Sequence, residues 1–259
     1  MALLTVKDLQ QMKKDGKKIA AAVVYEYQMT KICERCGVDL LSVGDSLGRN
    51  VLGQADVDDC TVDDMIPFAR AVVRGRERAI VSIDMPTTPS RAGATEVGKA
   101  ARRFKDEAGV DMCKIDIRTR EEELFDGVQA VIDAGLEVYP QIGYPTQGAN
   151  RGVQSGPEVH EHVMKWAHAI EDAGGAMIDM TNVPPEIYED VCKSLRIPVI
   201  GGQAPPEADG KIQVAFSGIG AAAAMIDRTD DRPNAAKYAY DVMQRIINDI
   251  HAGKWGKGQ

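Results

Sequence analysis

The chain has 259 residues, of which 44% are hydrophobic, and its formal net charge is −8. This length is close to that of one (β/α)8 barrel and is long enough to bury a large core. An acidic chain without a basic cluster is not expected to bind nucleic acid or an anionic membrane, and no apolar run approaches the ~18 residues of a membrane-spanning helix. We therefore expect a small-molecule substrate, with no nucleic-acid and no membrane partner.

The elements expected in the first half of the chain alternate between helix and strand, because runs with helical spacing alternate with short apolar runs. In chain order they are a helix at 6–15, a strand at 18–24, a helix at 28–36, a strand at 39–43, a helix at 62–74, a strand at 79–83, a helix at 93–108 and a strand at 111–116.

The second half continues the same alternation. It is expected to hold a helix at 119–134, a strand at 136–142, a Gly/Pro/Asn/Gln-rich loop at 144–156, a helix at 157–173, a strand at 176–180, a helix at 184–195, strands at 197–200 and 212–215, and a helix at 233–252.

This repeated pattern predicts a parallel sheet with right-handed crossovers. A closed (β/α)8 TIM barrel is the preferred α/β fold, and an open doubly wound sheet is the alternative. The sequence has neither G-x-G-x-x-G after a strand nor G-x-x-x-x-G-K-[ST], so nucleotide fingerprints do not support the open sheet. With no linker or change of composition, we expect a single barrel domain over 1–259 with N-terminal and C-terminal helices.

Five cysteines are scattered along the chain, and this odd number fits a reducing cytoplasm better than a disulfide framework. We therefore expect a cytoplasmic protein. Cys33 and Cys36 form a C-x-x-C pair on a predicted helix, but there is no second pair to complete a zinc site. Packing is preferred over a redox role for this pair.

Carboxylates stand at the ends of three successive predicted strands: Asp45, Asp84 and Asp116. Adjacent strands lie ~4.8 Å apart, so these groups converge at the carboxyl end of a barrel, where barrel enzymes place their chemistry. Carboxylates that close repel one another unless a cation neutralises them, and oxygen ligands suit Mg²⁺ or Mn²⁺. Lys114 shares a strand face with Asp116 and adds a fixed positive charge. The alternative is that lysines or helix N-termini pair with the three carboxylates.

The same stretches resemble the ketopantoate hydroxymethyltransferase family, within the phosphoenolpyruvate mutase/isocitrate lyase superfamily of barrels. The resemblance covers about residues 17–215 and rests on Tyr25-Glu26-Tyr27, Gly44-Asp45-Ser46-Leu47-Gly48, Thr61-Val62-Asp63-Asp64-Met65, Asp84-Met85-Pro86, Lys114-Ile115-Asp116, Ile197-Pro198-Val199-Ile200-Gly201 and Asp209-Gly210.

This resemblance implies an enzyme that binds Mg²⁺ through Asp45, Asp84 and Asp116, the last standing where the family usually has Glu. In the family the metal chelates a 2-oxo acid and stabilises an enolate, which attacks a one-carbon unit from methylenetetrahydrofolate. The resemblance also implies a homo-oligomer. It assigns Lys114 an electrostatic role and substrate binding to Ser46, Gly44, Tyr25 and Asn182.

Two positions depart from the family pattern. Gln141 stands where the family has a histidine, and Thr181 stands where it has the glutamate that serves as general base. Neither Gln nor Thr titrates near pH 7, so neither can perform that proton transfer. Glu26 and the histidines His160 and His162 remain as replacement bases, while His168 and His251 have no supporting context.

We therefore predict a metal-dependent enzyme of the aldol or retro-aldol type, with Lys114, Glu26, Gln141 and Thr181 as its candidate catalytic residues. The altered residues predict divergence toward hydroxymethyl transfer or release of an aldehyde such as formaldehyde, with methylenetetrahydrofolate as cofactor only if transferase activity is retained. A true 3-methyl-2-oxobutanoate hydroxymethyltransferase and a non-catalytic metabolite-binding homologue are the alternatives.

Overall fold

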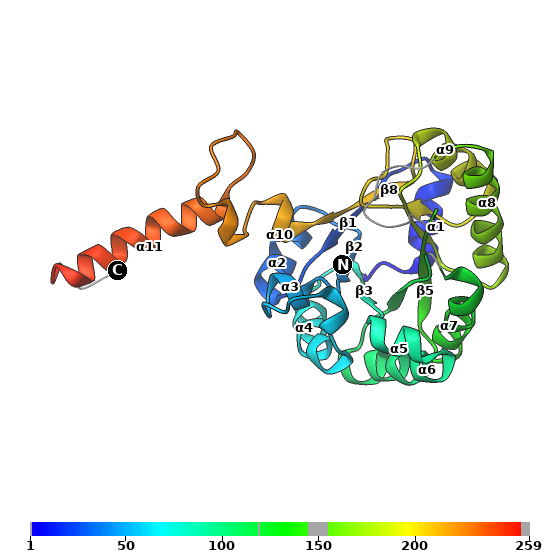
Figure 1. Ribbon diagram of the computed structural model, residues 1–259, viewed down its shortest axis with the longest axis horizontal. Helices are drawn as coiled ribbons and strands as arrows, with labels where there is room; N and C mark the ends of the chain where they lie inside the picture. Colours follow the sequence, from blue (N-terminus) through cyan, green and yellow to red (C-terminus); the bar gives the residue numbers. More distant parts are fainter. Residues whose placement is uncertain (1, 119, 145–154, 255–259) are drawn as a thin grey trace. The chain divides into compact units, whose positions relative to one another are not determined.

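A computed structural model describes residues 2–118, 120–144 and 155–254. Its eight strands form one sheet in the order β7-β6-β5-β4-β3-β2-β1-β8 (Figure 1). Each neighbouring pair from β1 to β7 is parallel. Asp209 N donates to Val199 O over 3.0 Å and Ile212 N donates to Gly201 O over 3.2 Å, which joins the start of β8 to β7. The sheet is thus a nearly closed barrel, and the predicted (β/α)8 fold is confirmed.

The strands are short and mostly buried. They are β1 Ile19–Val23, β2 Leu40–Val43, β3 Ile80–Asp84, β4 Met112–Asp116, β5 Glu137–Gly143, β6 Ile178–Thr181, β7 Val199–Ile200 and β8 Gly210–Val214.

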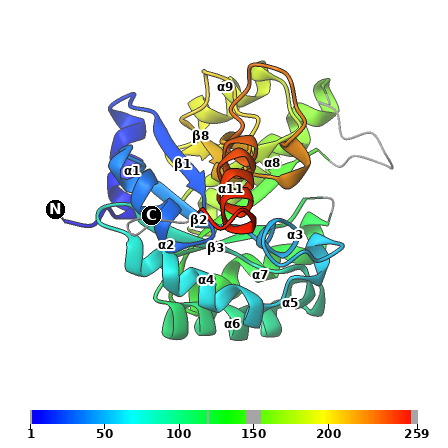
Figure 2. The same cartoon turned by 90° about the vertical axis from the view of Figure 1, so that its left-hand side faces the viewer.

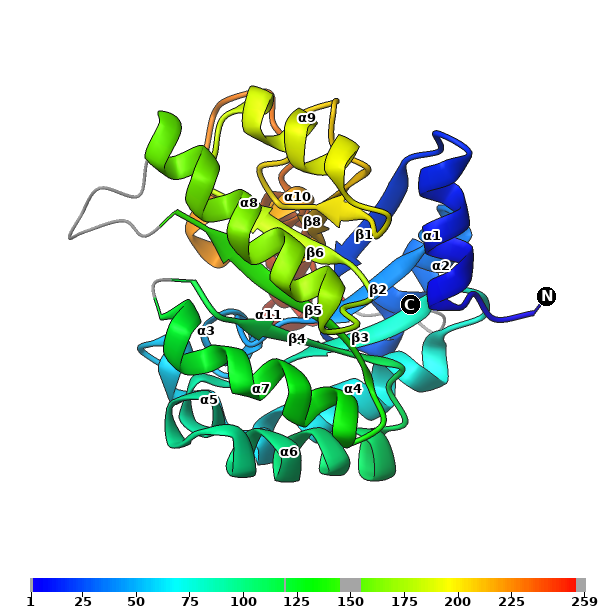
Figure 3. The ribbon, with the colours of Figure 1, turned by 90° about the vertical axis from the view of Figure 1, so that its right-hand side faces the viewer.

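The α-helices alternate with these strands. They are α1 Val6–Lys14, α2 Tyr27–Arg35, α3 Leu47–Asn50, α4 Val62–Gly75, α5 Thr87–Ala92, α6 Ala94–Arg103, α7 Glu121–Asp133, α8 Pro157–Asp172, α9 Pro185–Ser194, α10 Ala215–Gly218 and α11 Ala235–His251. Shorter helical pieces are the 3₁₀ turns η1 Val57–Asp59 and η3 Ala223–Met225, and the π-helical segment η2 Phe104–Ala108. Within residues 2–213, α2 and α4 lie adjacent to each other near β2, and α7 and α8 lie beside β5 (Figures 2 and 3).

The structure adds detail to two of the predicted elements. Helical structure covers 94–108 as expected, but it changes from α-helix to π-helix at Phe104 and is preceded by the unpredicted α5. Gly93 has a φ of 99°, which interrupts helical geometry between α5 and α6. The eighth strand begins at Gly210 and ends at Val214, earlier than expected, because Ala215 begins α10. Most of the loop expected at 144–156 lies outside the described residues.

The start of α4 illustrates how local sequence places these helices. Thr61 is the N-cap: its hydroxyl accepts from Asp64 N over 3.1 Å, while the Asp64 carboxylate accepts from Thr61 N over 3.0 Å. This reciprocal capping box satisfies backbone donors that the first helical turn leaves free. The cap fixes the point at which the long β2–α4 connection ends. This connection forms one wall of the site described below.

Polar side chains occupy part of the barrel interior. The Tyr139 hydroxyl on β5 lies 3.1 Å from Ser42 Oγ on β2 and 3.1 Å from Ser82 Oγ on β3, and all three residues are buried. Ser42 Oγ also donates to Asp84 Oδ1 over 3.4 Å. Buried polar groups are costly unless they are hydrogen-bonded. This connected set therefore forms a polar layer directly below Asp84.

The chain divides into two compact units, Met1–Gln213 and Val214–Gln259, which are described separately. In the second unit Asn234 caps α11, since its side-chain oxygen accepts from Lys237 N over 2.9 Å. One side of α11 exposes a row of large apolar residues: Tyr240, Met243, Ile246, Ile247 and Ile250. Across the part of the chain that the structure describes, no helix combines the length and apolar character needed to cross a bilayer.

Candidate active site

A cavity of about 620 Å³ lies at the carboxyl ends of strands β2 to β5. The connection after β2 and the turn after β6 complete its wall. Six of the residues that the sequence singled out line it: Asp45, Asp84, Lys114, Asp116, Gln141 and Asn182. The barrel thus brings residues from five different segments of the chain to one place.

Asp45 and Asp84 form the acidic end of this cavity. Gly44, directly before Asp45, has no room for a side chain, because a Cβ at this position would lie 2.8 Å from Val23 Cγ1 and 3.0 Å from Ser46 Oγ. Burial, and then the neighbouring charge of Asp84, raises the pKa of Asp45 to about 7. A buried carboxylate with so high a pKa beside a second carboxylate is an environment that favours a cation.

Lys114 lies beside this pair on β4. Its Nζ is 3.0 Å from Asp84 Oδ2 and 3.7 Å from Asp179 Oδ2, and the lysine side chain is only 13% exposed. Burial alone would lower the pKa of Lys114, but Asp84 and Asp179 more than offset it, so that its pKa is well above the ordinary value. The site therefore holds a fixed ammonium group next to its acidic end.

Asp179 is a site residue that the sequence reasoning missed. It lies on β6, is 3% exposed, and its Oδ1 has no hydrogen-bond partner within the described residues. Burial raises the pKa of Asp179 to about 6, although Lys114 opposes the shift. One sequence feature could have pointed to Asp179: it is a carboxylate inside an apolar strand, and it stands two residues before Thr181, so that both side chains lie on the same face of the strand.

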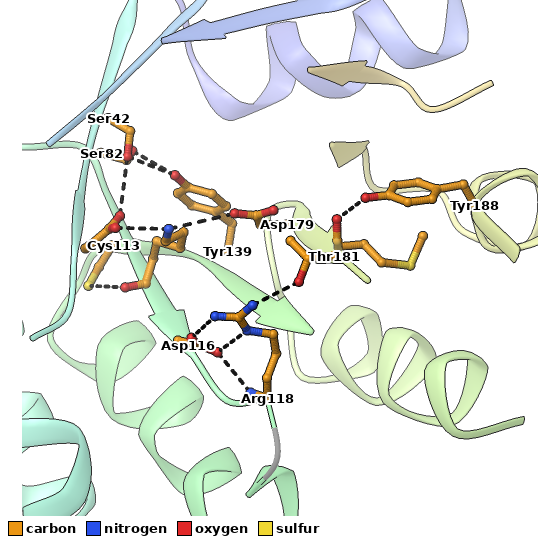
Figure 4. Close-up of polar contacts among 12 residues, drawn as sticks. Ser42, Ser82, Cys113, Asp116, Arg118, Tyr139, Asp179, Thr181 and Tyr188 are labelled. Carbon is orange, nitrogen blue, oxygen red and sulfur yellow. Dashed lines mark hydrogen bonds and ion pairs between the residues drawn. The ribbon is translucent and has the colours of Figure 1, made fainter. Parts of the chain in front are cut away.

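A second missed residue, Arg118, connects the ends of β4 and β6 (Figure 4). Its Nε donates to Asp116 Oδ1 over 2.9 Å and its Nη2 donates to Asp116 Oδ2, while its Nη1 donates to Thr181 Oγ1 over 3.1 Å. Both carboxylate oxygens of Asp116 are thereby engaged. Arg118 also holds the Thr181 hydroxyl. In the family, the Thr181 position is occupied by the glutamate that serves as general base.

Two of the predicted substrate-binding residues, Tyr25 and Ser46, are in contact with each other. The Tyr25 hydroxyl lies 2.9 Å from Ser46 Oγ and accepts from Asn50 Nδ2 over 2.8 Å. Asn182 has a φ of 61°, a left-handed conformation that non-glycine residues rarely adopt. Strain of this kind is found at functional positions, where the surrounding fold maintains it.

The three replacement bases considered from the sequence have other contacts. Glu26 is the N-cap of α2, where its carboxylate accepts from Met29 N over 2.7 Å, and it is not among the residues that line the cavity. His160 Nε2 lies 3.0 Å from Asp190 Oδ2, and His162 Nε2 lies 3.0 Å from the buried Glu121. The structure does not bring these groups to the acidic end.

The donor set fits a hard divalent cation through Asp45 and Asp84. Within the described ranges, no group of three or more His, Cys, Asp or Glu side chains is arranged as a complete metal site. Arg118 engages both carboxylate oxygens of Asp116, which leaves Asp45 and Asp84 as the donor pair, with Asp84 also paired to Lys114 at 3.0 Å. Mg²⁺ is commonly bound by one or two carboxylates and keeps further positions for water or substrate, so this pair is sufficient for it.

Sequence comparison relates the chain to one family of enzymes. A sequence profile for ketopantoate hydroxymethyltransferase matches residues 3–255. The chain is 34% identical over 221 residues to the 3-methyl-2-oxobutanoate hydroxymethyltransferase of Shouchella clausii, covering 83% of this chain and 78% of that protein. It is 30% identical over 262 residues to the protein of that name from Chloroflexus aurantiacus, covering 96% and 89%.

Solved structures with the same fold come from the PEP mutase/isocitrate lyase superfamily. A 2,3-dimethylmalate lyase superposes with a TM-score of 0.67 at 15% identity, covering 95% of this chain and 86% of its own. The phosphoenolpyruvate phosphomutase of Streptomyces platensis subsp. rosaceus gives 0.67 at 14% identity, covering 97% and 89%. A phosphonopyruvate hydrolase solved with oxalate and Mg²⁺ gives 0.64 at 13% identity, covering 96% and 88%.

Proposed function

Because the chain belongs to the ketopantoate hydroxymethyltransferase family, we propose that it is a Mg²⁺-dependent enzyme that makes or breaks a carbon–carbon bond next to an enolate. Its relatives in the family and its structural neighbours are enzymes. The observation that carries the proposal is the arrangement of Asp45, Asp84 and Lys114, with 3.0 Å between the Lys114 ammonium and Asp84.

Each of these residues has a defined part in the proposal. Asp45 and Asp84 hold the divalent cation, whose charge stabilises an enolate when it is bound. Lys114 offers a permanent positive charge to the developing oxyanion, in a cavity where water screens it poorly. The family resemblance assigns Ser46 to the carboxylate of a 2-oxo acid; its Oγ lies 2.9 Å from the Tyr25 hydroxyl, directly after Asp45 in the chain and outside the residues that line the cavity.

The direction of the reaction follows from Thr181. Removing a proton from carbon needs a strong base within hydrogen-bond reach of that proton, and Thr181 provides none. The Thr181 hydroxyl also accepts from Arg118 over 3.1 Å, so a cation lies where a carboxylate base would be needed. In the retro-aldol direction the first proton leaves a substrate hydroxyl, which is far more acidic than a C–H group, and passes to water. The carbon–carbon bond then breaks to give the aldehyde and an enolate, which takes a proton back from water. We therefore propose cleavage of a hydroxymethyl carbonyl compound with release of an aldehyde, such as formaldehyde.

Synthesis by hydroxymethyl transfer is the second candidate, because the curated relatives at 30–34% identity carry the name 3-methyl-2-oxobutanoate hydroxymethyltransferase. In that case methylenetetrahydrofolate would be the one-carbon donor. Both candidates share the acidic end and Lys114, and they differ in whether a carbon-bound proton must be removed.

The test is a formaldehyde-release assay of the purified protein with hydroxymethyl 2-oxo acids, ketopantoate first, in Mg²⁺ and in EDTA. We expect release only with Mg²⁺, and its loss in Asp84→Ala. Asp58→Asn is the matched control, because Asp58 lines the same cavity but is paired with Arg91 at 2.7 Å. Absence of turnover in both directions, with metabolite binding retained, would indicate a non-catalytic homologue.

A further inference from the structure

Arg118 offers more hydrogen-bond donors than the protein uses. A guanidinium group has five N–H donors. Within the part of the chain that the structure describes, the Arg118 side chain donates three hydrogen bonds, two to Asp116 and one to Thr181. One N–H on Nη1 and one on Nη2 therefore remain. These two donors remain for a carboxylate bound in the cavity, the kind of group that arginine characteristically binds through two N–H donors.

The position of the Arg118 guanidinium group is fixed by its partners. Asp116 Oδ1 also accepts from the backbone N of Arg118 over 3.0 Å. The Arg118 backbone therefore helps to fix the Asp116 carboxylate, and this carboxylate in turn orients the Arg118 guanidinium group. The contact with Thr181 fixes the other side of the guanidinium group. Such pre-organisation reduces the side-chain entropy lost on binding a ligand. The Arg118 side chain lines the cavity and is 30% exposed, which leaves it accessible to a molecule bound there.

Arg118 and the acidic end line the same cavity but come from different strand ends. Asp45 and Asp84 belong to the ends of β2 and β3, whereas Arg118 bridges the ends of β4 and β6. A single ligand in the cavity can therefore contact the acidic end with one group and Arg118 with another. Asp116 and Thr181 hold Arg118 in place for such a ligand.

We propose that Arg118 binds a second carboxylate, at the far end of the substrate, and that the natural substrate is a short-chain 2-oxo dicarboxylate or its hydroxymethyl derivative. This inference rests on the proposed function for the placement of the 2-oxo end. It adds a substrate class to that function: a dianion instead of a 2-oxo acid with an apolar tail. Arg118 is then the residue that determines this specificity.

Calorimetry with two matched probes tests the inference without turnover. The probes, 2-oxoglutarate and 2-oxopentanoate, have the same carbon chain and differ in the terminal carboxylate. In Mg²⁺ we expect the wild-type protein to bind 2-oxoglutarate at least about tenfold more tightly, since hydrogen bonds to charged groups are stronger than neutral ones. Arg118→Gln should bring the two affinities within about twofold by weakening 2-oxoglutarate alone. Arg118→Lys should retain part of the preference, because it keeps the charge but loses the guanidinium N–H donors.

Two further variants sharpen the result. Arg120→Gln is the matched control, because Arg120 is paired with Glu123 and is not among the residues that line the cavity, and it should keep the full preference. Arg49 is the competing cation, because it lines the cavity from α3. Loss of the preference in Arg49→Gln but not in Arg118→Gln would overturn the assignment. Thermal melts of all four variants identify any that fail to fold.

Other outcomes separate the inference from the proposed function. Equal binding of the two probes by the wild-type protein, binding of neither, or an equal loss of both affinities in Arg118→Gln would overturn the inference. Mg²⁺-dependent aldehyde release would in those cases leave the proposed function standing. A clear preference for the dianion together with no turnover of any hydroxymethyl compound would overturn the proposed function and retain the carboxylate site.

Discussion

The carboxylate of Asp179 lies 3.7 Å from the ammonium of Lys114, and within the described residues its other oxygen has no partner. Asp84, on the neighbouring strand β3, holds the same ammonium at 3.0 Å. A buried carboxylate that is only half satisfied is expensive, so the barrel maintains this arrangement at a cost in stability. That cost is understandable if the pair fixes the Lys114 charge beside the reacting atoms.

Stability in EDTA should depend on pH through Asp179. Its pKa is raised from 3.8 to about 6, so the folded state favours the protonated form. The stabilising contribution is therefore present below pH ~4 and is lost as pH rises through about 6. The other charged groups that act on Asp179 are Lys114, Asp84, Arg118 and Asp116.

Asp179→Asn removes this titration. The unfolding free energy of the variant minus that of the wild type should therefore rise by up to about 3 kcal/mol as the pH is raised from 4 to 7.5. Chemical denaturation of both proteins across this range measures the difference. A wild-type-minus-variant difference that is constant with pH would contradict the assignment of this titration to Asp179.

Divalent-metal binding should depend on Asp84. Calorimetry with Mg²⁺ or Mn²⁺ should show a loss of at least about tenfold in affinity for Asp84→Ala, because one of the two carboxylates proposed to hold the cation is removed. Asp58→Asn should bind the metal as wild type does, since Asp58 is paired with Arg91. Equal metal affinity in wild type and Asp84→Ala would disprove the assignment of the metal site.

Introducing a carboxylate by Thr181→Glu should restore removal of a carbon-bound proton. We expect exchange of the C3 proton of 2-oxoisovalerate into D₂O, followed by NMR with Mg²⁺ present, to rise about a hundredfold, the lower range of general-base catalysis. Thr181→Gln controls for size without supplying a base. The account fails at this position if the wild-type protein already exchanges the proton as fast as the variant does.

Association between chains is expected from α11. Tyr240, Met243, Ile246, Ile247 and Ile250 are each at least 38% exposed, and contiguous exposed apolar surface is typical of protein–protein contacts. Light scattering should give a particle larger than the 28.0 kDa chain, and Met243→Lys with Ile250→Lys should reduce it to that mass. A wild-type particle of one chain at working concentration would refute the predicted homo-oligomer.

The sequence predicted the barrel because strand and helix periodicities are local, and each predicted strand has its counterpart among the eight observed strands. It also placed Asp45, Asp84 and Lys114 at strand ends, where the closed sheet then brings them together. The short helix α5 before Gly93 was missed, because six residues are too few to show a helical apolar pattern.

Arg118 and Asp179 were missed for another reason. The role of each depends on partners on other strands: Arg118 contacts Thr181, 63 residues away, and Asp179 contacts Lys114. Nothing local marks an arginine after a strand as part of a site, and the carboxylate inside an apolar strand is a local signal that does not name its partner. The loss of a base at Thr181 could be recognised from the sequence, but the guanidinium that lies against it required the structure.

The most direct measurement compares the two directions of the reaction with one preparation of the wild-type protein. One arm supplies 2-oxoisovalerate and methylenetetrahydrofolate and measures ketopantoate, and the other supplies hydroxymethyl 2-oxo acids, with and without a terminal carboxylate, and measures formaldehyde. We predict Mg²⁺-dependent formaldehyde release that exceeds ketopantoate synthesis by at least about tenfold, because Thr181 cannot act as a base for a C–H group. Efficient ketopantoate synthesis, abolished in Asp84→Ala, would contradict this account and would show that another group of this chain supplies the missing base.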